Sequence, residues 1–177
     1  TTAVSSAGIT KLKIGLYGAG ESANDKSKHS WRLYCLDHAT GRILWQRVAH
    51  EGVPPVSRHT KSSQANSTPA TDGKHVVALF NSGGLHCYNM DGKLLWKKDL
   101  GVLNSGAFDV VDLQWGFGSS PIIYENMVIV QCDLQADSFL TAFEINSGKQ
   151  IWRVPRDELP SWGTPTICET VSGPLLI

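Results

Sequence analysis

The sequence is poor in several features that would point directly to an activity. Its 16 basic and 16 acidic residues leave no net charge, which argues against a nucleic-acid binder that neutralises phosphates and against a polybasic membrane-surface protein. No apolar run approaches the roughly 20 residues of a membrane-spanning helix. The first residues, TTAVSSAGITKLK, lack the layout of a secretory signal. We therefore expect either no export signal or a mature or partial chain.

Closely spaced cysteines are also absent, although the chain has four, at positions 35, 87, 132 and 168. Without a Cys-x-x-Cys pair, a zinc ribbon or a thioredoxin-like site is excluded. The even number would allow two disulfides. Cys35 and Cys87 occupy one position of the repeat described next, in neighbouring copies, where they would lie too far apart to be bridged. We expect free thiols that are buried in strands as small hydrophobic side chains.

What the sequence does contain is an internal repeat. The segments RLYCLDHATGRILW, GLHCYNMDGKLLW and FLTAFEINSGKQIW each place a glycine four residues before a tryptophan. Upstream of the second and third, STPATDGKHVVALF and SSPIIYENMVIVQC share a proline seven residues before a valine. A further copy opens around Pro165. The glycine–tryptophan pairs are Gly41 with Trp45, Gly92 with Trp96 and Gly148 with Trp152.

Each copy predicts four short strands joined by tight turns, because apolar residues alternate and Asp-Gly or Ser-Gly punctuates them. Four strands in 40–50 residues is the size of a propeller blade. The fold class is therefore all-β, a β-propeller of four-stranded antiparallel blades. We place approximate blades at 14–45, 66–96 and 118–152, with an incomplete blade from 162, in a partial propeller over 1–177. Propellers usually close with four to eight blades, so we expect the remaining blades to come from the same longer chain or from another copy.

A loose glycine motif precedes the first repeat. GAGESA, at residues 18–23, fits the pattern of dinucleotide sites. The residues that follow it are polar and offer no apolar helix face, so a loop between strands is the better interpretation.

These repeats resemble those of the quinoprotein-type, or PQQ-like, propeller family. That family includes alcohol dehydrogenases that use pyrroloquinoline quinone (PQQ) and cofactor-free relatives such as the outer-membrane barrel-assembly lipoprotein. The resemblance covers nearly all of residues 31–177. It implies that each Gly and Trp pair forms a docking motif, in which the indole packs against the neighbouring blade. It also implies a bacterial periplasmic or secreted setting.

The candidate ligand site lies in the connections from one blade to the next. The Trp45–Pro69 and Trp96–Pro121 connections are far longer than hairpin turns, and long ordered loops are disproportionately functional. In propellers such connections reach the channel mouth, so we expect their polar and aromatic side chains to converge, unless they only bridge rim to axis. The candidates are Arg58, His59, Lys61, Gln64, Asp109, Asp112, Gln114, Trp115, Arg156, Asp157 and Trp162.

Two functions fit this sequence. The favoured one is a non-catalytic binding or scaffold module that holds a protein, peptide or saccharide, without a cofactor. The alternative is a PQQ- and calcium-dependent oxidoreductase acting on alcohols or sugars, whose site would lie largely in missing blades. The adjacent Cys-Cys pair of the family's alcohol dehydrogenases is absent, and we identify no catalytic residue or metal ligand. The chain is therefore expected not to be an enzyme.

Overall fold

The computed structural model describes residues 1–7, 22–23 and 25–177. The regular elements in this part of the chain are all β-strands, and no helix within it is long and apolar enough to cross a membrane. The strands are β1 (Thr2–Ser5), β2 (Ser22–Ala23), β3 (His29–Leu36), β4 (Ile43–Gly52), β5 (Arg58–His59), β6 (Ala70–Thr71), β7 (His75–Phe80), β8 (Gly84–Asn89), β9 (Leu94–Lys98), β10 (Ile122–Tyr124), β11 (Met127–Cys132), β12 (Phe139–Glu144), β13 (Gln150–Pro155), β14 (Ile167–Thr170) and β15 (Gly173–Leu176).

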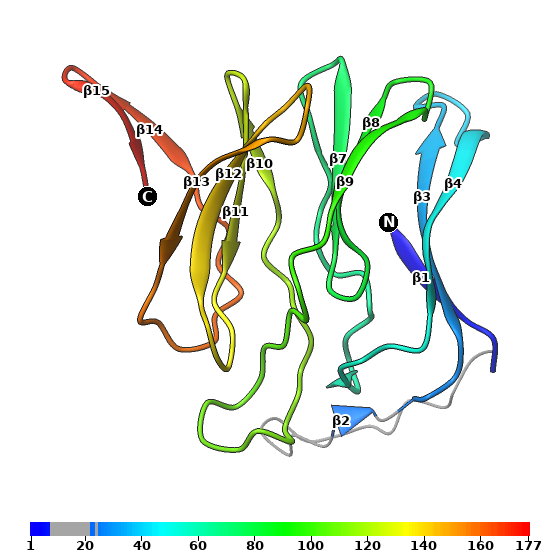
Figure 1. Ribbon diagram of the computed structural model, residues 1–177. Coiled ribbons are helices and arrows are strands. Elements are labelled where there is room, and N and C mark those ends of the chain that lie inside the picture. Colours follow the sequence, from blue (N-terminus) through cyan, green and yellow to red (C-terminus); the bar gives the residue numbers. More distant parts are fainter. Residues whose placement is uncertain (8–21, 24) are drawn as a thin grey trace.

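Two complete four-stranded sheets form the middle of the structure. Their orders are β6-β7-β8-β9 and β10-β11-β12-β13, so each strand pairs with its neighbour in sequence. Every pairing in the two sheets is antiparallel. We call these sheets blade 2 and blade 3. Figure 1 shows the sheets standing side by side with their strands running up and down. The predicted all-β propeller fold is therefore confirmed.

The first sheet, blade 1, has the order β1-β3-β4. The sequence predicted that this blade starts at residue 14, whereas β1 lies before that position. Residues 14–21 of the predicted blade lie outside the described residues. β4 continues past Trp45 to Gly52. Of the glycine motif, residues 18–21 are likewise outside the description, and Ser22–Ala23 forms β2, which pairs with β5. A β14–β15 hairpin follows blade 3.

Two hydrophobic clusters hold the blades together. Blade 2 contributes to both, because alternate side chains of β7 point to opposite faces of the sheet. Val77 and Leu79 belong to a cluster shared with blade 3, and Ala78 and Phe80 to a cluster shared with Trp31 and Leu33 of blade 1. Blade 2 is thus packed on both faces, which explains the almost fully buried pattern of β7 and β8.

Where blade 1 meets blade 2 and where blade 2 meets blade 3, a tryptophan indole of the first blade packs on a glycine turn of the next. The Trp45 indole lies on the Gly92 turn and donates a hydrogen bond to the Met90 carbonyl (2.8 Å). The Trp96 indole lies on the Gly148 turn and donates to the Ile145 carbonyl (2.6 Å). A Cβ at either glycine would fall within 3 Å of the indole. These turns require glycine both for space and for their positive φ.

Two members of the docking set have no such contact in the described part of the chain. A Cβ at Gly41 would meet nothing within 4 Å. The Trp152 indole is half-buried, and its N–H has no hydrogen-bond partner among the described residues. Among the described residues, no tryptophan therefore packs on the Gly41 turn, and Trp152 packs on no glycine.

All four cysteines are free, as predicted. Burial is confirmed for Cys87 and Cys132 and is wrong for the other two, because Cys35 is half-buried and Cys168 is exposed. Cys87 lies under buried Ile145 of the next blade, with Sγ 3.8 Å from its carbonyl oxygen. In blade 2, Met90 takes the place that Ile145 has in blade 3, because each accepts the hydrogen bond of the docked indole. Met90 is 44% exposed and therefore gives Cys35 less cover.

Candidate ligand-binding site

The long connections meet at one end of the blades, opposite the glycine turns (Figure 1). We call this end the loop face and define it as residues 56–66, 104–118 and 156–163. Hydrogen bonds tie the connections together. The His59 N–H donates to the Trp115 carbonyl (3.0 Å). The Ser22 hydroxyl donates to the Gln114 carbonyl (2.8 Å) and accepts from the Gln114 N–H (2.9 Å). The loop face is therefore a folded surface with its own internal bonding.

A cavity of about 440 Å³ opens on this face. All three connections contribute to it, so the predicted convergence of their side chains is observed for part of the candidate set. Four predicted residues line the cavity, namely His59, Lys61, Trp115 and Trp162. Its other lining residues are Ser62, Asn66 and Gly118.

The apolar wall of the cavity is a pair of indoles. The ring centroids of Trp115 and Trp162 are 5.9 Å apart with planes tilted by 31°. Trp162 donates its indole N–H to the Gly116 carbonyl (2.8 Å). It also lies directly over Gly118, where a Cβ would come within 2.9 Å of the ring. Glycine at 118 therefore leaves room for the edge of the Trp162 ring beside the backbone. The Trp115 N–H is buried and has no partner among the described residues.

The polar rim is set by short-range hydrogen bonds. The Lys61 N–H donates to Nδ1 of His59 (3.1 Å), so the remaining ring proton of neutral His59 is on Nε2. Arg58 donates from Nη1 to the carbonyls of His59 (3.2 Å) and Ser62 (2.8 Å). Asn66 donates to the Ser62 hydroxyl (2.7 Å). These bonds fix the shape of the rim before any ligand arrives.

Three other predicted candidates are hydrogen-bonded or paired within the structure. Gln64 is buried, donates to the Val56 carbonyl and accepts from the Asn81 amide. Gln114 accepts from the Ser57 N–H (2.6 Å). The Arg156 guanidinium lies 2.8 Å from buried Asp133. The structure thus gives all three side chains partners that fix the connections.

The acidic candidates lie away from the cavity. Asp109 and Asp112 are exposed on the 107–113 hairpin. Asp157 lines a separate cavity of about 210 Å³ beside Phe108 and Arg156. The described residues that line the 440 Å³ cavity therefore include no acidic residue.

Sequence reasoning missed the residue that fixes the third connection. Asp133 is 3% exposed and accepts hydrogen bonds from Gln131, Arg156 and Ser161, each at 2.8 Å. Because Ser161 precedes Trp162, this carboxylate positions one half of the aromatic wall. An acidic residue directly after the buried β11 strand was the only signal in the sequence.

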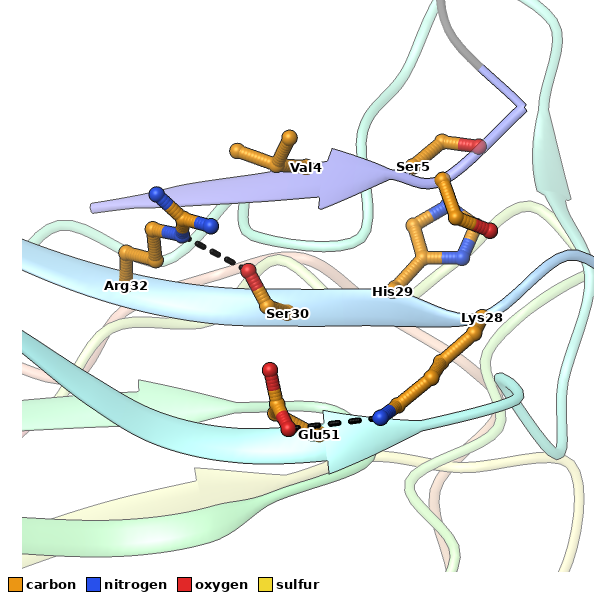
Figure 2. A pocket seen from close by; sticks show the side chains of 8 residues that line it. Val4, Ser5, Lys28, His29, Ser30, Arg32 and Glu51 are labelled. Atoms are coloured by element: carbon orange, nitrogen blue, oxygen red, sulfur yellow. Dashed lines mark hydrogen bonds and ion pairs between the residues drawn. The ribbon is translucent and has the colours of Figure 1, made fainter.

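A second hollow lies on blade 1 and is smaller, about 180 Å³. Figure 2 shows Lys28 paired with Glu51 (3.3 Å), and Nε of Arg32 donating to the Ser30 hydroxyl (2.7 Å). Glu51, the acidic side chain among its described lining residues, is thus already paired, and these residues include no Trp, Tyr or Phe. It is the weaker candidate.

The alternative function would require a calcium site. Calcium takes six to eight oxygen ligands, several of them from carboxylates. Across residues 1–7, 22–23 and 25–177, no three His, Cys, Asp or Glu side chains gather closely enough to hold a metal.

Comparison with solved structures finds 45 similar chains, and the following two are examples. One is a europium-containing methanol dehydrogenase, with a TM-score of 0.46 and 16% identity over 72% of this chain and 23% of that chain. The other is BamB from Moraxella catarrhalis, with a TM-score of 0.43 and 18% identity over 78% of this chain and 38% of that chain. The chain therefore spans less than two-fifths of the length of either structure.

No curated protein matches it. At the level of families, residues 29–172 match the family described as outer membrane protein assembly factor BamB. The chain belongs to this family.

Proposed function

We propose that this chain is a non-catalytic propeller module that binds a ligand or partner through its loop face. The observation that carries the proposal is the 440 Å³ cavity, which three separate connections build around two indoles. Binding pockets typically combine such an apolar wall with a few fixed polar groups. The His59, Asn66 and Arg58 side chains are engaged in bonds that hold the loops, which suits recognition of a ligand by a preformed surface.

The family supports a role in binding, since its description is that of an assembly factor. We infer a protein, peptide or saccharide as the ligand, a periplasmic or secreted location, and function without PQQ or calcium. Nucleic acid is a poor candidate because the chain has no net positive charge.

We also propose that further blades complete the propeller, from the same longer chain or from another copy. The Gly41 turn has the same form as the Gly148 turn. Gly41 donates its N–H to the Asp37 carbonyl (2.8 Å) with φ of 70°, and Gly148 donates to the Glu144 carbonyl (2.8 Å) with φ of 67°. Gly148 carries an indole, and a Cβ at Gly41 would meet nothing within 4 Å among the described residues, so we propose that the Gly41 turn receives the indole of a further blade. Trp152 offers the reciprocal half of such a contact.

Titration with PQQ and calcium separates the two functions. Tryptophan fluorescence follows binding, and a dye-linked assay with alcohols and sugars follows oxidation. We expect neither saturable binding nor turnover. Saturable binding of PQQ together with dye reduction would establish the oxidoreductase and overturn the proposal.

A substitution in the aromatic wall tests the binding role directly. Peptide and oligosaccharide panels are screened against the wild-type chain, and hits are repeated with Trp115→Ala. We expect at least one class of ligand to bind the wild type and to be lost in this variant. Trp152→Ala is the matched control, because it removes an indole that is not among the described residues lining the cavity. Binding that survives Trp115→Ala unchanged would place the site elsewhere.

A further inference from the structure

A buried histidine lies where blade 1 packs on blade 2. His86 of β8 is 2% exposed. Its ring stacks on Tyr88, with centroids 6.2 Å apart, and meets Phe80 edge-on at 5.9 Å. Tyr88 and Phe80 both belong to the cluster that blade 2 shares with blade 1. From blade 1, His50 lies against the turn before β8, since a Cβ at Gly83 would come within 2.9 Å of the His50 Cβ. His86 is therefore part of the interface between the two blades.

The hydrogen bond of His86 defines where its proton lies. Nε2 of the ring is 2.8 Å from the Gly83 carbonyl oxygen. Because a carbonyl oxygen only accepts, Nε2 carries the proton of the neutral ring, and Nδ1 keeps a lone pair. Nδ1 is buried and has no hydrogen-bond partner among the described residues. A second proton on Nδ1 would therefore be a buried donor without an acceptor, which is costly.

The groups around His86 also oppose a positive charge on its ring. Lys97 of β9 is its cross-strand partner, and His50 faces it from β4 of blade 1. Strands β3 and β7 contribute apolar side chains to the same cluster. Burial lowers the pKa of His86 below its ordinary value of 6.5, and repulsion by Lys97 and His50 lowers it further, against the opposing effect of the Gly83 hydrogen bond. Tyr88 stays uncharged, because burial raises its pKa.

The same interface holds the first connection of the loop face. Asn81, directly after β7, donates its side-chain amide to the side-chain oxygen of Gln64. The Trp31 indole N–H donates to the Gln64 carbonyl (2.9 Å). Residues 56–66 are therefore attached to blade 1 through Trp31 and to blade 2 through Asn81. Both attachments can persist together only while the two blades stay in contact.

We propose that protonation of His86 opens the contact between blades 1 and 2 and releases residues 56–66. Near neutral pH the imidazole is neutral and the contact is closed. As the pH falls, a second proton on Nδ1 is accommodated only when the ring reaches water, so blade 1 separates locally from blade 2. This opening does not depend on binding. Its effect on a ligand rests on the binding function proposed above, because four residues of the 56–66 connection line the cavity.

Hydrogen exchange followed by mass spectrometry tests the opening without any ligand. Opening constants for residues 56–66, β3 and β8 are compared between about pH 7.5 and about pH 5, after correction for the intrinsic pH dependence of exchange. Because folding lowers the pKa of His86, its contribution to stability is complete above about 6.5 and is lost as the pH falls below that value. One proton raises the opening constant by at most about tenfold per pH unit, and we expect a rise approaching that slope. A flat profile below pH 6.5 would overturn the proposal.

Variants assign the rise to His86. His86→Gln keeps an amide donor for the Gly83 carbonyl and gains no proton, so the rise should disappear. His38→Gln is the matched control, because His38 is exposed, and it should keep the wild-type slope. Lys97→Gln changes an exposed side chain and removes repulsion from the protonated ring, so it should reduce the rise without unfolding blade 2. An undiminished slope in His86→Gln would overturn the proposal.

A second buried histidine of blade 1 provides a further control. His29 contacts Trp31, with ring centroids 5.8 Å apart, and pairs with Asp25 (3.7 Å). A rise that disappears in His29→Gln and persists in His86→Gln would assign the proton to His29 instead. The outcome of these measurements is separate from that of the ligand screen. A ligand that binds with the same affinity across this pH range would leave the binding function standing and would overturn the link between the opening and the cavity.

Discussion

Gly148 and Gly41 have nearly the same backbone and very different surroundings. Their φ angles are 67° and 70°. A Cβ at Gly148 would lie 2.7 Å from the Trp96 ring, and one at Gly41 would meet nothing within 4 Å. Gly41→Ala therefore suffers only left-handed backbone strain, about 1–2 kcal/mol. Gly148→Ala suffers that strain and a clash with a buried indole, which adds about 1–3 kcal/mol.

Urea unfolding of the two variants measures this difference. We expect the free energy of unfolding to fall further for Gly148→Ala than for Gly41→Ala. Equal losses of unfolding free energy would mean that the Trp96 indole moves aside at little cost. The docking contact would then contribute little to stability.

The thiols differ in reactivity for a similar reason. Burial raises the pKa of Cys87 and of Cys132 to about 12, so these thiols stay protonated and unreactive near neutral pH. Cys168 is exposed and Cys35 is half-buried. Iodoacetamide at pH about 8 should modify Cys168 first and Cys35 more slowly. Mass mapping should find Cys87 and Cys132 modified only after unfolding, and rapid labelling of either in the folded chain would contradict their burial.

At the scale of elements, the turns between the third and fourth strands are fixed by a carboxylate. This holds for blades 3 and 1, whereas the amide of Asn89 takes that place in blade 2. In blade 3, hydrogen bonds from Ser147, then from Asn146, lower the pKa of Glu144 from 4.5 to about 2. Asp37 occupies the same place in blade 1, and hydrogen bonds from Thr40 lower its pKa. Because folding lowers these pKa values, their contribution to stability is complete above the unfolded value and is lost as pH falls toward the folded one.

Acid should therefore destabilise the wild type more than Glu144→Gln. The excess loss is expected between pH 4.5 and about 2, the window set by the Glu144 pKa. Thermal melting at several pH values measures it. Glu125→Gln is the control, because Glu125 has no hydrogen-bond partner in the described residues. An equal pH dependence of wild type and Glu144→Gln would show that the turn does not use the charge.

The strands and turns could be predicted from the sequence because their signals are local. The Val-rich segments, the alternation around Cys87 and the glycine four residues before each tryptophan all lie within one blade. The roles of Gln64 and Arg156 could not be predicted in this way. Their partners, Asn81 and Asp133, are 17 and 23 residues away, and only the packed blades bring them together.

At the scale of the whole molecule, the site depends on the order of the blades. His59 lies on the connection between blades 1 and 2, Trp115 on the connection between blades 2 and 3, and Trp162 after blade 3. The sequence indicated that these connections converge, because every blade returns its chain to the same end. It could not indicate that four of the predicted side chains share one cavity, since this depends on the angle between blades.

Blade 2 packs on blade 1 with one face and on blade 3 with the other. A substitution in its core should therefore destabilise the neighbouring blade as well. Repeat proteins are stabilised by each repeat and by its contacts with neighbours. Leu85 of blade 2 is fully buried in the cluster shared with blade 3, while Leu33 of blade 1 is 2% exposed in the cluster shared with blade 2. Each change to alanine costs about 2–5 kcal/mol. The two variants should differ in which part of the chain opens.

Hydrogen exchange followed by mass spectrometry reads this difference blade by blade. Leu33→Ala should speed exchange in β3 and β4 and leave β11 and β12 protected, because blades 2 and 3 keep their shared core. Leu85→Ala should speed exchange in β7, β8, β11 and β12 together, since it opens the interface between blades 2 and 3. Equal loss of protection in all three blades for both variants would instead mean that the chain unfolds as one unit. The cavity would then be lost with any blade, because no pair of neighbours could hold its walls alone.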